Sequence, residues 1–140
     1  EEVIRERIPT AVSIVNPVYN PAVRSYLNTY IYRRPEHTAM MLGWAAVYFP
    51  MFEKALAEEG LPTDLKYLSI VESALNPAAI SRSGAGGLWQ FMKPTARECG
   101  LKISSYVDER MDPDKSTKAA VHYLKQLYAM FGNWELVMAA

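Results

Sequence analysis

The sequence is poor in the residues that mark several common kinds of site. It has one cysteine and two histidines among 140 residues. Cys99 cannot form an intramolecular disulfide, and we expect it to act as a small buried hydrophobe. His37 and His122 are isolated from each other and from other ligand types, so the sequence predicts no metal centre. Disulfide-stabilised and zinc-dependent folds are therefore not indicated.

The chain also lacks an excess of charge and a long hydrophobic run. Its 15 basic and 15 acidic residues cancel, which gives no electrostatic reason to expect a nucleic-acid partner. No run approaches the roughly 20 apolar residues of a membrane-spanning helix. With 140 residues, of which 50% are hydrophobic, the chain can form one core but is too short for a second full domain.

Apolar residues repeat at helical spacing over most of the chain, and alternating apolar and polar runs are scarce. This pattern predicts an all-α fold. Pro94 fits the first turn of a helix after the central loop. We expect the other helices over about residues 20–31, 36–48, 50–60, 63–75, 115–131 and 133–140.

Residues with known preferences at helix ends set the expected boundaries. The predicted N-caps are Asn20, Thr63 or Asp64, Asp114 and Asn133, and the predicted glycine stops are Gly60 and Gly132. Pro50 is expected to begin a new helix, and Asn76-Pro77 to end the helix that carries Glu72. Before Asn20, with Ile8-Pro9 and Asn16-Pro17, residues 1–19 are expected to form an extended arm or linker. A single domain would then occupy residues 20–140.

The most informative segment begins at Glu72. Apolar residues flank it on both sides, so a helix would hold its carboxylate at the edge of an apolar face. A carboxyl group in such surroundings has a raised pKa and can keep a proton near neutral pH. An acid of this kind can protonate the leaving oxygen of a glycosidic bond. The alternative interpretation is an ordinary solvated glutamate on a helix.

The residues after Glu72 favour the first interpretation. A loop rich in serine and glycine follows, and its glycines allow backbone N–H groups to approach a ligand closely. It contains Ser81, Ser83, Gly84, Gly86 and Gly87. In the next segment we expect Gln90 and Met92 on one side, with Leu88, Trp89 and Phe91 largely in the core.

These residues resemble the catalytic region of the soluble lytic transglycosylase family. The family's Glu-Ser pair is matched by Glu72-Ser73, its Asn-Pro by Asn76-Pro77, its loop serine by Ser81, and its Gly-Leu-aromatic-Gln-x-Met by Gly87 to Met92. The resemblance covers residues 48–140 well and residues 1–47 more loosely. It implies an all-α, lysozyme-like helical domain of the kind that goose-type lysozymes share.

The resemblance also implies a mechanism and a set of site residues. Glu72 would be the catalytic acid and then the base in non-hydrolytic cleavage of the β-1,4 bond between N-acetylmuramic acid and N-acetylglucosamine in peptidoglycan, giving 1,6-anhydro ends. Ser81 and Gln90 would hydrogen-bond the sugar or orient Glu72, and Met92 would line the subsite. Ser73 would bind substrate or, more simply, support the helix end. No cofactor or metal is implied.

Two departures from the family pattern stand out. Lys93 follows Met92 where the family usually has proline, and Pro94 comes one residue later. The family also has an Ala-Tyr-Asn motif followed by glycines, whose tyrosine lies near the catalytic glutamate. This chain ends at Ala139-Ala140, where that Tyr-Asn would begin. We therefore expect a C-terminally incomplete domain with one wall of the site missing.

Other residues compete with Glu72 for a catalytic role. Asp108, Glu109, Asp112 and Asp114 could supply the second carboxylate that many glycosidases use, although capping and turn chemistry explain this cluster more simply. Tyr123 could touch substrate, but a tyrosine at helical spacing is more often part of the core.

Three functions remain open from the sequence alone: a lytic transglycosylase, a hydrolytic muramidase of the goose-type lysozyme kind, and a module that binds peptidoglycan, or merely supports structure, without cleaving it. The expected partner is the glycan strand of peptidoglycan, with no nucleic acid and no membrane span in this chain, which is expected to be a monomer. The resemblance implies a location in the bacterial cell envelope, in the periplasm. Whether the full-length protein carries a lipid anchor stays open.

Overall fold

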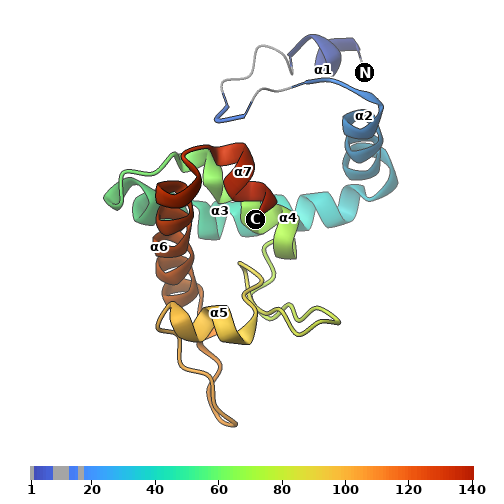
Figure 1. Cartoon of the computed structure of the whole chain (residues 1–140). Helices are drawn as coiled ribbons and strands as arrows, with labels where there is room; N and C mark the ends of the chain where they lie inside the picture. Colours follow the sequence, from blue (N-terminus) through green and yellow to red (C-terminus); the bar gives the residue numbers. More distant parts are fainter. Residues whose placement is uncertain (1, 8–12, 16–17) are drawn as a thin grey trace.

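The structure is a computed structural model, and it describes residues 2–7, 13–15 and 18–140. Two long helices organise it: α3 (Pro35–Glu58) and α6 (Pro113–Phe131), which pack against each other. Figure 1 shows α6 beside α3, with the short helices α4, α5 and α7 grouped around them. The described residues form no β-strand, only isolated bridges. The predicted all-α class is confirmed.

The remaining elements are short. None of the helices in the described part of the chain is long and apolar enough to cross a membrane. In chain order the shorter elements are α1 (Glu2–Arg7), α2 (Pro21–Asn28), the π-helix η2 (Thr29–Arg33), the 3₁₀ helix η3 (Thr63–Tyr67), α4 (Leu68–Ser73), α5 (Lys93–Glu98), the 3₁₀ helix η4 (Glu109–Met111) and α7 (Trp134–Ala139).

Several predicted helix ends are confirmed. The Asn20 side chain accepts a hydrogen bond from the Val23 backbone N–H at 2.9 Å and caps α2. Asn133 accepts from the N–H groups of Glu135 and Leu136 at the start of α7. Gly132 ends α6 in the left-handed conformation, which costs glycine little because it has no Cβ.

The predicted break at Pro50 is wrong. Residues on both sides of Pro50 belong to the single helix α3, although an interior proline removes one backbone hydrogen bond and costs about 3 kcal/mol. The Pro50 ring is exposed, whereas Phe52 is fully buried and packs against Tyr48 and Phe49. Aromatic packing on the inner face of α3 outweighs the local preference of the proline.

Two predicted N-caps are also wrong. The backbone at Thr63 and Asp64 forms the 3₁₀ helix η3, and no side-chain cap bond precedes it. At α6 the cap is Asp112, which accepts from the Lys115 N–H at 2.9 Å. Asp114 instead lies in the first turn and pairs with Lys118. The α6 helix begins at Pro113, a favoured first-turn residue, so the cap falls one position earlier, at Asp112.

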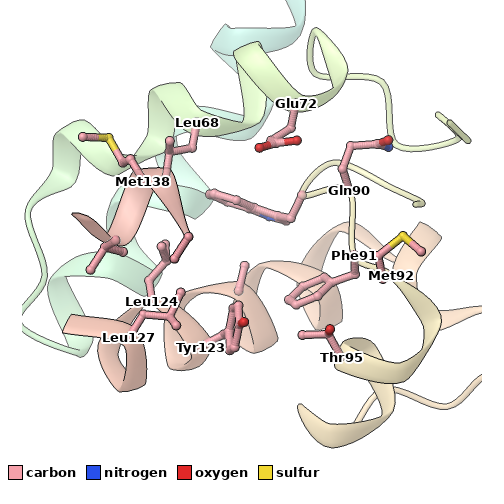
Figure 2. Close-up of a pocket in the computed structure, with 14 residues that line it drawn as sticks. Leu68, Glu72, Gln90, Phe91, Met92, Thr95, Tyr123, Leu124, Leu127 and Met138 are labelled. Carbon is pink, nitrogen blue, oxygen red and sulfur yellow. The ribbon is translucent and has the colours of Figure 1, made fainter. Parts of the chain in front are cut away.

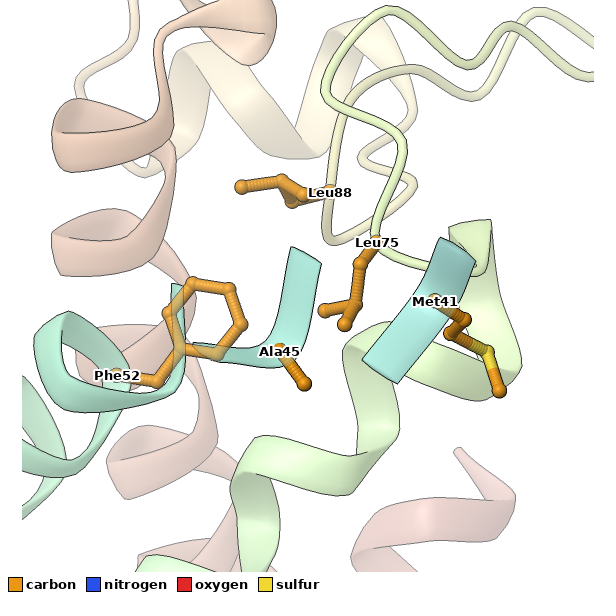
Figure 3. Packing of buried hydrophobic residues seen from close by; sticks show 5 residues of the cluster. All are labelled: Met41, Ala45, Phe52, Leu75 and Leu88. Atoms are coloured by element: carbon orange, nitrogen blue, oxygen red, sulfur yellow. The ribbon is translucent and has the colours of Figure 1, made fainter. Parts of the chain in front are cut away.

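The first of three hydrophobic clusters ties the loop residues around Glu72 to α3. Its buried members are Met41, Ala45, Phe52, Leu75 and Leu88, and Figure 3 shows the last two side chains lying against the α3 residues. Leu75 follows α4, and Leu88 precedes Gln90. Both are fully buried. The segments on either side of the serine-glycine loop therefore have fixed positions.

The other two clusters hold the elements around α6. One joins Leu56 of α3, Leu65 of η3, Val121 and Leu124 of α6 and Val137 of α7. The other joins Phe91, Ala96 and Leu101 to Ala119 and Ala120 of α6. Because each of the short helices α4, α5 and α7 contributes to a cluster, these three helices and the long helix α6 surround a common space.

The N-terminal segment is only partly described. Residues 2–7 form the short helix α1 rather than extended chain, and partly buried Ile14 packs against the cluster that contains Leu56. Ile8-Pro9 and Asn16-Pro17, on which the predicted arm rested, lie outside the described residues. The division into an arm over 1–19 and a domain over 20–140 stays a prediction.

Candidate active site

A cleft of about 300 Å³ lies between α4, α5, α6, α7 and the segment that follows the serine-glycine loop. Figure 2 shows Glu72 on one side of this cleft and Tyr123 and Thr95 on the other. Its lining residues are Leu68, Glu72, Trp89, Gln90, Phe91, Met92, Thr95, Ala120, Tyr123, Leu124, Leu127, Val137, Met138 and Ala140. The structure thus brings Glu72, Gln90 and Met92 together at one cavity.

Glu72 lies in the last turn of α4, as predicted, but the helix ends earlier than Asn76-Pro77. Ala74 and Leu75 follow with φ of 52° and 63°, both in the left-handed region. Such a conformation is unfavourable for residues with a Cβ. It turns the chain so that Leu75 enters the core with no exposed surface. Burial of Leu75 therefore ends α4 at Ser73, one residue after Glu72.

The carboxyl group of Glu72 has mostly apolar surroundings. Leu68 and Trp89 line the cleft together with Glu72, and within the described residues no hydrogen bond or ion pair to Glu72 is formed. Partial burial, acting without a compensating charge, raises the pKa of Glu72 above the ordinary value for a glutamate. The residue is nevertheless exposed to solvent on its open side, so a ligand can reach it.

Ser73 faces away from the cleft. Its hydroxyl donates to the carbonyl of Leu88 at 2.9 Å, and Ser69 donates to the same oxygen at 2.8 Å. These two bonds connect α4 to the segment that carries Gln90 and Met92. Ser73 does not line the cavity, and its observed contacts fit support of the helix end rather than direct contact with a ligand.

Gln90 has an unusual backbone conformation. Its φ is 49°. This left-handed conformation costs free energy for a residue with a side chain, and it persists only where the surrounding structure holds it in place. The side-chain amide donates to the carbonyls of Gly87 at 2.9 Å and Ala79 at 3.2 Å. These bonds fix the amide at the cleft edge, where Gln90 forms part of the lining.

Of the predicted site residues Met92 and Ser81, only Met92 belongs to the lining of the cleft. Met92 lines the cleft and is 43% exposed. Ser81 is not among the lining residues; its hydroxyl accepts from the Ala85 N–H at 3.0 Å and lies 3.2 Å from the Ser83 hydroxyl. Ser81 therefore closes the turn of the serine-glycine loop, and the structure does not bring it to Glu72.

Sequence reasoning missed Arg110, a buried residue that holds this loop. Its side chain is 2% exposed and pairs with Asp108 at 2.7 Å. One guanidinium nitrogen also donates to the carbonyl of Gly84 at 2.7 Å and to that of Phe91 at 2.9 Å. The guanidinium keeps the pKa of Asp108 below its usual value. The detectable signal was the spacing of Asp108 and Arg110, which permits a local ion pair.

We predict that Arg110→Met lowers the free energy of unfolding by about 3 kcal/mol, because it removes the guanidinium that pairs with the partly buried Asp108 carboxylate and donates to two carbonyls. Lys118→Met is the matched control, since it removes an exposed pair with Asp114 worth less than about 1 kcal/mol. Urea denaturation of both variants measures the difference. Equal losses for the two variants would show that Arg110 is not the anchor of the loop.

The acidic residues that competed with Glu72 have structural partners. Glu109 pairs with Lys115 and accepts from the Lys102 N–H, while Asp112 caps α6. Asp108 and Asp114 pair with Arg110 and Lys118. Neither these four nor any other aspartate or glutamate besides Glu72 lines the cleft, and the described part of the chain contains no cluster of three potential metal ligands.

For Cys99 and Tyr123, the predicted burial in the core is confirmed only in part. Cys99 is only partly buried; it packs against the Phe91 cluster, and desolvation raises the pKa of its thiol. Tyr123 packs against the same cluster and also lines the cleft, so it belongs to both the core and the candidate site.

A small helical domain with one acidic side chain in a central cleft is typical of the lysozyme-like class. The comparison with known families agrees with this class. Residues 49–140 match the model of the Transglycosylase SLT domain, and the chain belongs to this family.

Several curated relatives share part of the sequence, and the chain spans only part of the length of each. Membrane-bound lytic murein transglycosylase D of Escherichia coli (strain K12) is 42% identical over 84 residues, 59% of this chain and 19% of that protein. Peptidoglycan transglycosylase gp16 of Escherichia phage T7 is 34% identical over 94 residues, 66% of this chain and 7% of that protein. A protein of Alteromonas sp. (strain M-1) named for tributyltin chloride resistance is 31% identical over 124 residues, 88% of this chain and 57% of that protein.

Proposed function

We propose that this chain cleaves the glycan strands of peptidoglycan as a lytic transglycosylase. The observation that carries the proposal is the position of Glu72, the one acidic side chain lining the cleft, in surroundings that raise its pKa. Membership of the Transglycosylase SLT domain family supports the reaction class. The names of two relatives, a lytic murein transglycosylase and a peptidoglycan transglycosylase, support the substrate.

A single carboxyl group favours transglycosylation over hydrolysis. Glycosidases that use water, or a covalent intermediate, place two carboxyl groups on either side of the bond. When the attacking hydroxyl belongs to the substrate itself, it is already held near the reacting carbon and has a high effective concentration. The remaining task is to move one proton to the leaving oxygen and another away from the nucleophile, and one carboxyl group can do both in turn.

The proposed sequence of steps is balanced without water. Protonated Glu72 donates its proton to the glycosidic oxygen as the bond between the N-acetylmuramoyl C1 and the leaving N-acetylglucosamine oxygen breaks. The Glu72 carboxylate then accepts the proton of the C6 hydroxyl of the same muramoyl residue. The C6 oxygen bonds to C1, which gives a 1,6-anhydro end and regenerates protonated Glu72. This chemistry requires no cofactor.

The other predicted site residues are assigned supporting roles. Gln90, with its amide held at the cleft edge, would hydrogen-bond the sugar, and Met92 would contact it with an apolar side chain. Ser73 would position Glu72 through the Leu88 carbonyl. Ser81 would shape the loop through its bond with Ala85 rather than touch Glu72 in the free protein.

The proposed setting is the bacterial cell envelope, in the periplasm, with the chain acting as a monomer on glycan strands. Peptidoglycan lies in this compartment, and the relative from Escherichia coli (strain K12) is named as membrane-bound.

Mass spectrometry of digested peptidoglycan tests the proposal. Purified sacculi would be incubated with this chain and, in parallel, with a form extended past Ala140 by the family's Tyr-Asn-glycine segment. We expect muropeptides with 1,6-anhydromuramic ends, which are one water lighter than hydrolysed products. Reducing muramic ends would instead identify a muramidase, and an absence of cleavage by both forms would favour a binding module.

The raised pKa of Glu72 predicts a specific pH dependence. The free protein must carry the Glu72 proton to start the reaction, so kcat/KM should fall as pH rises through the pKa of Glu72. Because partial burial raises that pKa, the fall should occur at a higher pH than the titration of an ordinary glutamate. The rate of release of soluble fragments, measured across the acidic to neutral range, checks this. A rate that increases steadily over that range would contradict the role of Glu72 as an acid.

A further inference from the structure

The first half of α3 carries an apolar stripe that stays exposed. Met40, Trp44 and Val47 are spaced by four and three residues and therefore share one face of the helix. They are 54%, 42% and 61% exposed. The contacts of this half of α3 with the core are made by Met41 and Ala45 instead. The stripe is thus not part of the core, and contiguous exposed apolar surface of this kind marks an interaction site.

The segment before α3 adds further exposed apolar side chains. Tyr26 of α2 and Ile31 and Tyr32 of η2 are exposed. Thr38 ties this segment to α3, because its hydroxyl donates to the Tyr30 carbonyl at 2.6 Å. Figure 1 shows α2 and the start of α3 projecting from the other helices. We call residues 20–47 the N-terminal projection; it lies outside the segment that matches the family model.

The N-terminal projection is positively charged. Between residues 20 and 47 the sequence has three arginines, no lysine and a single acidic residue, Glu36. Arg33 and Arg34 directly precede α3, are exposed, and form no ion pair with other described residues. They place two cations at the end of the helix that bears the apolar stripe.

Trp44 is held in place before any partner binds. Its ring stacks on Tyr48 with the ring centroids 5.8 Å apart, and Tyr48 stacks in turn on the fully buried Phe52. A side chain that is already fixed loses little conformational entropy on binding. Tryptophan is also a side chain that favours the boundary between lipid headgroups and acyl chains.

We propose that the apolar stripe, with Arg33 and Arg34, docks this chain on the surface of an anionic lipid bilayer. Met40, Trp44 and Val47 enter the boundary between headgroups and acyl chains, and the two guanidinium groups bind lipid phosphates. Apolar burial and attraction to anionic lipid together give reversible binding of a helix that lies on the surface. A two-fold pair of chains would bring two positive projections together, so charge favours the bilayer over a second copy.

Sedimentation with lipid vesicles tests the docking without requiring cleavage of glycan. One set of vesicles contains phosphatidylcholine alone, and the other contains equal amounts of phosphatidylcholine and phosphatidylglycerol. We expect the wild-type chain to bind the anionic vesicles at least about tenfold more tightly, because each arginine contributes about fivefold near an anionic surface. Added salt should weaken this binding, since it screens the attraction between exposed charges.

Two pairs of matched variants locate the docking surface. Val47→Ser should weaken binding to anionic vesicles roughly three- to tenfold. Val107→Ser makes the same change in the exposed turn after α5 and should have no effect. Arg33→Gln should weaken binding about fivefold. Its control is Arg97→Gln, an exposed position in α5, which Figure 1 shows well apart from α2.

The fluorescence of Trp44 reports the contact directly. Moving this indole from water into the bilayer boundary should shift the wild-type emission to shorter wavelength when anionic vesicles are added. Trp44→Phe should lose this shift, although Trp89 and Trp134 remain in the chain. A shift of the same size in Trp44→Phe would overturn the proposal.

Three further results would also overturn the proposal. The first is a wild-type chain that leaves anionic vesicles unbound, or that Val47→Ser and Val107→Ser weaken equally. The second is a chain that ignores vesicles but sediments as a dimer broken by Val47→Ser, which would assign the stripe to a second copy. The third is retention on purified sacculi, lost in Val47→Ser, without vesicle binding, which would assign the stripe to the cell wall.

Discussion

Replacing Glu72 with glutamine should lower the turnover of peptidoglycan by about 10²- to 10⁴-fold, the usual contribution of a positioned acid or base. Glutamine has nearly the same shape but can neither donate nor accept the required proton. Because no other acidic side chain lines the cleft, no neighbour can take over the role. The rate of release of soluble muropeptides measures the effect.

The same variant should remain folded, which separates loss of chemistry from loss of structure. A pKa that is raised in the folded state means that the carboxyl group binds its proton more tightly there than in the unfolded chain. The ionised form therefore costs stability, and this cost appears as pH rises from the unfolded to the folded pKa. Glu72→Gln removes it, so the variant should be at least as stable as the wild type at neutral pH. Retained activity would remove Glu72 from the mechanism.

Gly87→Ala should destabilise the protein by more than about 4 kcal/mol, a loss that only a few kinds of substitution cause. Gly87 has φ of +80°, and a Cβ added there would lie 1.9 Å from the backbone oxygen of Arg110. Neither backbone segment can move freely, because Arg110 also binds the carbonyls of Gly84 and Phe91. The substitution should therefore disturb the loop that carries Gln90 as well as the global fold.

Gly84→Ala separates the two causes of this loss. Gly84 has a similar φ of +87°, but nothing lies within 4 Å of an added Cβ. It should cost only the conformational penalty of about 1 to 2 kcal/mol. Thermal or urea unfolding of the two variants gives the comparison. A Gly87→Ala variant as stable as Gly84→Ala would show that the close approach of the loop to Arg110 is not a constraint.

The sequence indicated the main features of the site because they depend on neighbouring residues. The position of Glu72 in the last turn of a helix followed from the apolar residues before it and the turn residues after it. Side-chain alternation predicted that Gln90 and Met92 share one side and that Leu88, Trp89 and Phe91 lie largely in the core; Leu88 and Phe91 are buried, whereas Trp89 is only partly buried and also lines the cleft. The place of Gln90 and Met92 in the site was implied by the family resemblance. The caps at Asn20 and Asn133 followed from local side-chain chemistry.

The features that sequence reasoning missed depend on contacts between distant residues. Arg110 binds carbonyls 26 and 19 residues away, and no local pattern predicts such partners. The continuation of α3 through Pro50 depends on packing of Phe52 that outweighs a local penalty. The early end of α4 depends on burial of Leu75, and the inward turn of Ser73 on the position of the Leu88 carbonyl.

The central claim is that the nucleophile is the substrate's own hydroxyl and not water. Digestion of peptidoglycan in water enriched in the heavy oxygen isotope tests it most directly, with mass spectrometry of the new muramoyl ends. The account predicts anhydro ends without heavy oxygen for the active protein and no new ends for Glu72→Gln. Heavy oxygen at C1 of the new muramoyl ends would contradict it and would show that the cleft catalyses hydrolysis.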